Sequence, residues 1–288
     1  MIILDLNQVM ISNLMAQIGN HTNIDIDENL LRHMILNTIR ALNMKFKVEY
    51  GEMIIACDDK NYWRKDIFPY YKASRSEDRE KSEINWNEVF TYLNKIREEL
   101  KQFFPYKVVQ VNRAEADDII GTLIHERFGK DFAGEPVLIL SGDKDFKQLQ
   151  VYPNVRQYDP VKKKFLLESN PQRFLREHII RGDRGDGIPN FLSDANCLVI
   201  KKRMKSVYEV KLDKWLNCEK PEDFCENTQQ LTRWYQNRDL VDLSRIPESI
   251  KTEILNTYDS LKSNGRGKLF DYFINYNIKN LMDSIGDF

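Results

Sequence analysis

Short uninterrupted apolar runs recur along the first half of the chain. They are IILDL at 2–6, MIIACD at 53–58, YKVVQV at 106–111 and VLIL at 137–140. Runs of this length and character are typical of strands buried within a parallel sheet. A further alternating stretch at 154–169 predicts a β-hairpin.

Longer segments with helical periodicity separate these runs. Apolar side chains recur on one face over 30–46 and again over 86–104, and a further amphipathic helix is expected from about Ala114. Pro171 opens another helix, and from about residue 191 onward the sequence predicts mainly helix with no strong strand. The alternation of strand and helix predicts an α/β fold, with a central, mostly parallel sheet flanked by helices.

Composition describes a globular chain without a zinc or disulfide framework. Of 288 residues, 42% are hydrophobic and 30% charged, which allows a large core. The four cysteines and four histidines show neither CxxC nor HExxH spacing, so a reducing compartment, the cytoplasm, is expected. The start, MIILDLNQVM, does not resemble a signal peptide, and no apolar run is long enough to cross a bilayer.

Two tight acidic clusters suggest a metal site. Glu115, Asp117 and Asp118 form the first cluster, and Asp143 and Asp145 the second. Carboxylates packed this closely repel one another, and burying them is costly unless a cation compensates. All-oxygen ligands favour hard ions such as magnesium, manganese or calcium over zinc.

Position along the predicted elements brings these acids together. Asp143 directly follows the strand at 137–140, and Asp5 and Asp58 end two other predicted strands. If the strands are parallel, all three acids lie at the same edge of the sheet, where open α/β sheets bind ligands. Asp117 leads an apolar stripe and is expected to face the sheet. Taken singly, each cluster could also be an ordinary acidic helix start or an ordinary turn.

Basic residues concentrate elsewhere. Net charge is −1, but seven basic side chains fall within 60–81, and four more crowd 201–205. The segment 59–85 is too polar for core and too aromatic for a disordered linker, which indicates a functional loop. Basic residues mixed with aromatic residues are typical of sites that bind single-stranded nucleic acid. A surface loop that packs its aromatic rings on the protein body is the alternative.

The ordered set of motifs resembles a known family. Asp5, Asp58, the EADD motif at 115–118, SGDKDF at 141–146 and GDRGDGIP at 182–189 occur in the order found in the flap endonuclease or 5′-nuclease family. The segment YWRKDIFPYYKASR and the chain's last residues resemble in particular the ribonucleases H of T-even phages. The resemblance extends nearly from end to end, and it implies a 5′-nuclease or PIN-like fold with a helical arch.

The resemblance also assigns roles to individual residues. It implies a first metal site made of Asp5, Asp58, Glu115, Asp117 and Asp143. It implies that a second ion, or its waters, is held by Asp118, Asp145, Asp183 and Asp186. In the arch, Tyr71, Lys72 and Arg75 match the family's YKxxR pattern and Arg79 follows one turn later; all four are expected to contact nucleic acid. Lys72 and Arg75, together with Asp117, are the expected catalytic residues.

One departure concerns the stretch after GDGIPN. FLSDANCLVIKKRMK lacks the glycines with which many relatives form a hairpin on the duplex backbone, and this argues against a potassium-dependent clamp. Lys201, Lys202, Arg203 and Lys205 are expected to supply duplex contacts instead. The expected division is therefore a nuclease core at 1–182, which includes the arch at 59–85, and a mainly helical region at 183–288 that contacts duplex nucleic acid.

The activity implied by the resemblance is phosphodiester hydrolysis assisted by two Mg²⁺ ions, with Mn²⁺ as a possible substitute. Its expected substrates are RNA–DNA and DNA duplexes with 5′ ends or flaps. The expected role is removal of lagging-strand RNA primers in the cytoplasm of a phage-infected host. A single-stranded DNA-binding protein is a possible partner. The chain is expected to be a monomer and not to associate with a membrane.

Three other functional interpretations of the acidic motifs are less consistent with the sequence. A haloacid-dehalogenase-like phosphatase needs two acids at the first strand, whereas this chain has Asp5-Leu6-Asn7. A PIN-type ribonuclease would share the acids but not the long basic-aromatic insertion. A non-enzymatic module that binds metal and nucleic acid would need fewer acids than this chain carries.

Overall fold

A single six-stranded sheet forms the centre of the computed structural model, which describes residues 1–19, 26–129 and 134–288. The strand order is β3-β2-β1-β4-β5-β6; β1 to β5 are parallel to their neighbours and β6 is antiparallel to β5. The strands are β1 Ile2–Asp5, β2 Met53–Cys57, β3 Lys107–Gln110, β4 Val137–Leu140, β5 Val155–Asp159 and β6 Lys164–Leu166. The predicted parallel sheet and the predicted hairpin are both confirmed.

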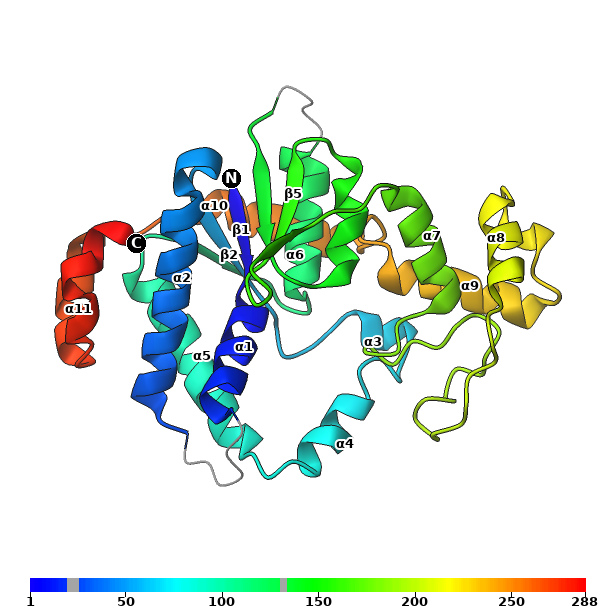
Figure 1. Cartoon of the computed structure of the whole chain (residues 1–288), viewed down its shortest axis with the longest axis horizontal. Helices are drawn as coiled ribbons and strands as arrows, with labels where there is room; N and C mark the ends of the chain where they lie inside the picture. The colour runs from blue at the N-terminus through cyan, green and yellow to red at the C-terminus, as the bar shows by residue number, and fades with distance from the viewer. Residues whose placement is uncertain (20–25, 130–133) are drawn as a thin grey trace.

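Helices cover both faces of this sheet (Figure 1). Side chains alternate along a strand, so Ile2 and Leu4 face one layer and Ile3 faces the other. The first layer contains α1 Leu6–Ile18, α2 Glu28–Tyr50 and α5 Trp86–Phe103, and the second contains α6 Ala116–Leu123, the π-helical turn η1 Ile124–Phe128 and the 3₁₀ segment η2 Lys144–Val151.

The end of the chain returns to pack on both layers. Ile250 and Ile254 of α10 Glu248–Ser260 join the apolar core around α6. Leu269 and Phe273 of α11 Leu269–Asn275, and Phe288, join the core on the other face, against α2 and α5. A short turn, η4 Arg266–Lys268, precedes α11, and η5 Lys279–Asp287 follows it.

A smaller group of helices extends beside this sandwich. It comprises α7 Pro171–Arg181, α8 Glu209–Asn217, the turn η3 Pro221–Asp223 and α9 Thr228–Val241. Ile180, Phe191, Trp215 and Trp234 form their shared apolar cluster. Residues 191–208 contain no helix, so the expectation of helix from about 191 is wrong for that stretch. Its run of like charges at 201–205 disfavours helix through repulsion between neighbouring side chains.

The basic-aromatic segment forms a bridge between the two groups of helices. It contains two short helices, α3 Arg64–Ile67 and α4 Ser74–Glu80, and then leads into α5 (Figure 1). Phe68 and Tyr71 are each 2% exposed and pack with Ile188 and Leu240. The base of this arch is therefore fixed by an apolar contact to the part of the chain that follows α7.

Among the residues that the structure describes, no helix combines the length and apolar character needed to span a bilayer.

Candidate active site and metal centre

Three neighbouring parallel strands deliver acids to one edge of the sheet. β1 lies between β2 and β4, so Asp5 at the end of β1, Asp58 after β2 and Asp143 after β4 meet at their carboxyl ends. Asp5 accepts hydrogen bonds from the Ser141 hydroxyl at 3.0 Å and from the Gln8 amide at 3.2 Å. The predicted gathering of these acids at one sheet edge is confirmed.

Asp58 ties this edge to the start of α6. Its Oδ1 accepts a hydrogen bond from the Ala116 amide at 2.7 Å, and its Oδ2 accepts one from the Asn7 side chain. The first turn of α6 is therefore held beside the strand ends. This contact brings the EADD acids next to the acids of the sheet.

Within that first turn, Asp118 rather than Asp117 faces the interior. Asp118 is fully buried and forms a capping box with Glu115, accepting the Glu115 amide at 2.8 Å. Its carboxylate also accepts the Trp63 indole N–H at 3.0 Å. Asp117 is half-buried and lies beside Asp143 and Asp5. Asp117 therefore faces the acids at the carboxyl edge of the sheet, as expected, whereas Asp118 points into the protein interior as the capping-box partner of Glu115.

A buried arginine holds the inner acids in place. Arg64 is 3% exposed, and its guanidinium lies 2.9 Å from Glu115 Oε2 and 2.8 Å from Asp118 Oδ1. Its Nε donates to the Leu240 carbonyl at 2.9 Å. Sequence reasoning counted Arg64 only as part of a basic patch and missed this role. Its place between two aromatic residues, in YWRKDIF, is the signal that it is packed inside.

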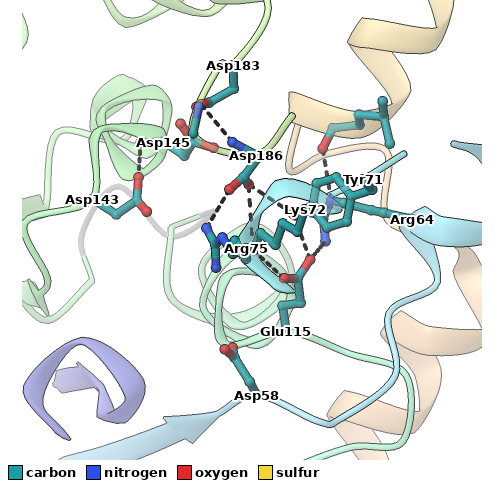
Figure 2. Close-up of polar contacts among 12 residues, drawn as sticks. Asp58, Arg64, Tyr71, Lys72, Arg75, Glu115, Asp143, Asp145, Asp183 and Asp186 are labelled. Atoms are coloured by element: carbon teal, nitrogen blue, oxygen red, sulfur yellow. Dashed lines mark hydrogen bonds and ion pairs between the residues drawn. The ribbon is translucent and has the colours of Figure 1, made fainter. Parts of the chain in front are cut away.

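The YKxxR residues of the arch lie between two groups of acids (Figure 2). Lys72 Nζ lies 2.5 Å from Glu115 Oε1 and 3.6 Å from Asp186 Oδ2. Arg75 pairs with Asp186 Oδ1 at 2.6 Å, and the Tyr71 hydroxyl lies 2.9 Å from Glu115 and 3.0 Å from Asp186. Because the Tyr71 ring is buried, it holds the acids in position and is not free to stack on a base.

The glycine-rich turn after α7 supplies Asp183 and Asp186. Asp183 Oδ1 accepts the backbone amides of Gly185 at 2.7 Å and Asp186 at 3.2 Å. Gly182 has a φ of +68°, and a Cβ there would lie 2.4 Å from the Ile188 carbonyl oxygen, so only glycine fits. The Asp186 carbonyl accepts the Lys72 amide at 2.8 Å, and Lys72 itself adopts a φ of 55°, which is unusual for a residue with a side chain.

Asp145 lies next to Asp183 and to a histidine that sequence reasoning did not single out. One ligand atom from each of Asp145, His178 and Asp183 lies within 4.8 Å of the other two. His178 belongs to α7, which packs against η2, the element that contains Asp145. No sequence pattern points to this residue, because no recognised motif connects position 178 with either acid.

The electrostatics of the gathered acids indicate a cation site. Burial, then repulsion from Asp58, raises the pKa of Asp5 to about 7. Burial and Glu115 raise the pKa of Asp58 to about 6, and burial and Asp145 raise that of Asp143 to about 6. These carboxylates resist ionisation without added positive charge, so a divalent cation fits this donor set.

Two acids behave in the opposite way because cations already contact them. Burial alone would raise the pKa of Glu115, but Lys72 and Arg64 lower it below its ordinary value. Burial would also raise the pKa of Asp183, but the contact with Lys144 lowers this pKa below its ordinary value. Glu115 and Asp183 are thus neutralised by cationic side chains of the protein, whereas Asp5, Asp58, Asp117 and Asp143 keep raised pKa values and would be stabilised in their ionised forms by a bound cation.

The remaining basic residues lie apart from the acids. Arg79 stacks on Trp86 and Phe90, with its guanidinium 5.5 and 4.7 Å from the ring centroids. A hollow of about 860 Å³ contains the second basic group; its lining includes Ser74, Arg181, Arg184, Lys201, Lys202, Arg203 and Lys205. Lys201 also pairs with Glu77 of α4 at 2.6 Å, so this hollow adjoins the arch.

Comparison with known proteins agrees with this geometry. Residues 2–178 match the model of the 5'-3' exonuclease N-terminal, resolvase-like domain, and residues 172–288 match that of the T4 RNase H C-terminal domain. The chain is 30% identical to ribonuclease H of Enterobacteria phage T4, over 99% of this chain and 95% of that one. It is 27% identical to flap endonuclease Xni of Shewanella pealeana, over 62% of this chain and 69% of that one.

The fold is also found among solved structures. The D15 flap endonuclease of bacteriophage T5, in a pseudo-enzyme-product complex with DNA and metal ions, superimposes with a TM-score of 0.64. That match covers 90% of this chain and 99% of the other, at 16% identity. The chain therefore belongs to the 5′-nuclease family, in the branch whose C-terminal domain is of the T4 RNase H type. It is accordingly an enzyme of the metal-dependent 5′-nuclease class.

Proposed function

We propose that this chain is a two-metal-dependent 5′→3′ exonuclease and flap endonuclease acting on RNA–DNA and DNA–DNA duplexes. Its role would be the removal of lagging-strand RNA primers in phage DNA replication. The observation that carries the proposal is the row of buried and half-buried acids with raised pKa values at the sheet edge, next to cationic side chains of an arch. The end-to-end relation to phage T4 ribonuclease H supports the choice of substrate.

Magnesium is the proposed metal, with manganese as a possible substitute, because every donor at the sheet edge is a carboxylate oxygen. Asp5, Asp58, Asp117 and Asp143 would hold the first ion, with Glu115 beside them. Asp145, Asp183 and Asp186 would hold the second. When bound, such a pair of ions activates water and stabilises both the attacking and the leaving oxygen of a phosphodiester.

Asp118 is better suited to positioning than to direct ligation. One of its oxygens pairs with Arg64, and the other accepts both the Trp63 indole and the Glu115 amide. These contacts fix the first turn of α6 and hence the direction of Glu115 and Asp117. Such supporting interactions orient the groups that contact a metal.

Lys72 and Arg75 would bind the phosphate at the cleavage point. Each is now paired with an acid of the site: Lys72 lies between Glu115 and Asp186, and Arg75 pairs with Asp186. A phosphate that enters this space offers them a new anionic partner. Positive groups fixed in a site of low dielectric stabilise developing phosphoryl charge, by about 3–4 kcal/mol for a well-aimed donor.

Duplex nucleic acid would lie along the basic hollow. Lys201, Lys202, Arg203 and Lys205 line it together with Arg181 and Arg184. Contacts of this kind neutralise backbone phosphates without reading sequence. On this proposal, residues 1–182 cut and residues 183–288 contact the duplex, although the helices after residue 248 pack on the core.

The chain is proposed to work as a monomer in the cytoplasm of an infected host, with a single-stranded DNA-binding protein as a possible partner. Sedimentation of the purified chain, alone and with such a protein, tests both statements. A stable dimer would contradict the first, and independent sedimentation of the two proteins would contradict the second.

One assay tests the proposed activity directly. A 5′-labelled DNA flap and a nicked RNA–DNA hybrid are each incubated with the chain in magnesium, in calcium and in chelator. We expect flap release and short 5′ products in magnesium, and no product in chelator. Products released from 3′ ends, or hydrolysis that persists in chelator, would contradict the proposal.

A further inference from the structure

The imidazole of His178 is directed at two acids of the proposed second metal site. Its Nε2 lies 2.9 Å from Asp145 Oδ1 and 3.5 Å from Asp183 Oδ2. Among the described residues, Asp145, His178 and Asp183 each offer one potential ligand atom, and these three atoms all lie within 4.8 Å of one another. The side chain of His178 is 5% exposed, so solvent does not satisfy this ring.

The fold holds the ring in this direction. His178 lies in the last turn of α7, and its carbonyl accepts the amide of Gly182, the residue that ends the helix. Phe174, one turn earlier, stacks on the imidazole with centroids 5.8 Å apart and planes 23° apart. Asp183 follows the fixed turn at Gly182, so helix, ring and acid are positioned together.

Two buried polar atoms at this point face each other without a hydrogen bond. His178 Nε2 and Asp145 Oδ1 are both buried and lack a hydrogen-bond partner. An unprotonated Nε2 and a carboxylate oxygen 2.9 Å apart repel each other, so this spacing needs either a hydrogen on Nε2 or a metal ion bound by both atoms. Ligands of a six-coordinate dication lie about 3 Å apart when each is about 2.1 Å from the ion, which matches the observed spacing.

We infer that His178 Nε2 is a ligand of the divalent ion held by Asp145 and Asp183. The site would then combine one nitrogen with carboxylate oxygens and prefer a transition-metal dication over Mg²⁺. Imidazole binds transition metals well and Mg²⁺ poorly, whereas carboxylates bind both. The inference rests on the proposed function, since it concerns one of that function's two metal sites.

Lys144 is the group that an ion would displace. Its Nζ lies 2.9 Å from Asp183 Oδ2, but its side chain is 49% exposed. It can therefore turn into solvent when a dication takes its place. The buried ring of His178 has no such freedom and remains at the site.

The decisive measurement uses Mn²⁺ as the probe and needs no variant. Wild-type chain receives less than one equivalent of Mn²⁺, so that the preferred site fills first, and pulsed electron paramagnetic resonance records the coupling to nearby nitrogen. We expect a nitrogen coupling whose pattern changes when the protein is labelled with ¹⁵N-histidine. Bound Mn²⁺ without such a coupling would show that the ring only forms an ion pair, and would overturn the inference.

A matched pair of variants measures the metal preference. His178→Gln replaces the nitrogen by an amide oxygen, so it should lose the coupling and weaken Mn²⁺ binding about 10-fold, with little change for Mg²⁺. His33→Gln on α2 should behave as wild type in both titrations. An unchanged ratio of Mn²⁺ to Mg²⁺ affinity in His178→Gln would contradict the inference.

The two levels of failure are separable. Hydrolysis of the flap in Mg²⁺ together with absent nitrogen coupling would remove His178 as a ligand and leave the nuclease proposal intact. Absence of flap hydrolysis with any divalent metal would instead remove the nuclease proposal itself.

Discussion

At the scale of single residues, the site separates acids that the protein satisfies from acids that it does not. Arg64 pairs with Glu115 and Asp118 and is buried with them, and Lys72 pairs with Glu115 at 2.5 Å. Asp117 and Asp143 have no comparable partner: burial raises the pKa of both, together with repulsion from Asp143 at Asp117 and from Asp145 at Asp143. The first group builds the site, and the second is suited to hold a metal ion.

Asp117→Asn should abolish hydrolysis while leaving the fold intact. The substitution removes a proposed metal ligand, and it also removes one of several repelling charges, so stability should be unchanged or slightly higher. We expect the turnover of the flap substrate to fall by more than about 100-fold, beyond the loss typical of residues that only support a metal ligand. Asp259→Asn, at an exposed pair with Arg127, is the control. Wild-type turnover by Asp117→Asn would exclude Asp117 from the metal site.

Arg64→Lys should destabilise the fold. A lysine cannot reach both Glu115 and Asp118 and the Leu240 carbonyl with one ammonium group, so a buried carboxylate is left without its partner. Breaking a buried pair in this way costs about 3–5 kcal/mol. Urea unfolding measures the loss.

The control for Arg64→Lys is Arg113→Lys. Arg113 pairs with Asp66 at the surface, where the two side chains are 45% and 66% exposed. A change there should be less than about 1 kcal/mol. Equal effects of the two substitutions would show that burial of Arg64 does not matter.

At the scale of elements, the arch at 59–85 is anchored to the fold by apolar contacts and carries basic side chains to the acids of the site. Its base packs Phe68 and Tyr71 into an apolar cluster, and its helix α4 contacts the basic hollow through the pair of Glu77 with Lys201. The same segment that brings cations to the acids is therefore fixed at one end to the fold. Cleavage and binding should consequently depend on different residues of this element.

Lys72→Met should slow cleavage much more than it weakens duplex binding. The stem of the side chain is kept and only the charge beside Glu115 and Asp186 is lost. We expect the single-turnover rate to fall about 100- to 1,000-fold, the range for one well-placed charge-stabilising donor, with less than about a 10-fold change in Kd. Lys65→Met, exposed on α3, is the control. Equal losses of rate and affinity would make Lys72 a binding residue only.

At the scale of the whole molecule, the site adds a pH-dependent cost to folding. Asp5, Asp58 and Asp143 belong to three different parts of the sequence, and folding forces them together. Each has a folded-state pKa raised to about 6 or 7 from an ordinary value near 3.8. Between these values the folded chain binds more protons than the unfolded chain, so its stability falls as pH rises.

In chelator, the free energy of unfolding should therefore decrease from about pH 4 to about pH 7, by about 1.4 kcal/mol for each full unit of pKa shift that is lost. Magnesium should reduce this decrease, because a bound dication favours the ionised acids. Urea unfolding at several pH values, with chelator and with Mg²⁺, measures both curves. Asp5→Asn should flatten the curve in chelator. Stability that rises with pH in chelator would contradict the assignment of these shifts.

Sequence patterns alone determined the sheet and which acids meet at its edge. Continuous apolar runs are typical of buried parallel strands, and residues at or just after the end of each run lie at the carboxyl edge of the sheet, so the meeting of Asp5, Asp58 and Asp143 was predictable. The order of motifs along the chain was sufficient to indicate the family. None of this required knowing how the helices pack.

Only the tertiary structure decided which acids stay free and which are neutralised. A pattern does not tell that Arg64 is buried against Asp118, that Asp118 rather than Asp117 turns inward, or that Tyr71 lies inside. His178 shows the same limit, since it lies far along the chain from Asp145 yet within 2.9 Å of it in space. Local sequence specifies the elements, whereas burial and charge pairing arise from contacts between distant segments.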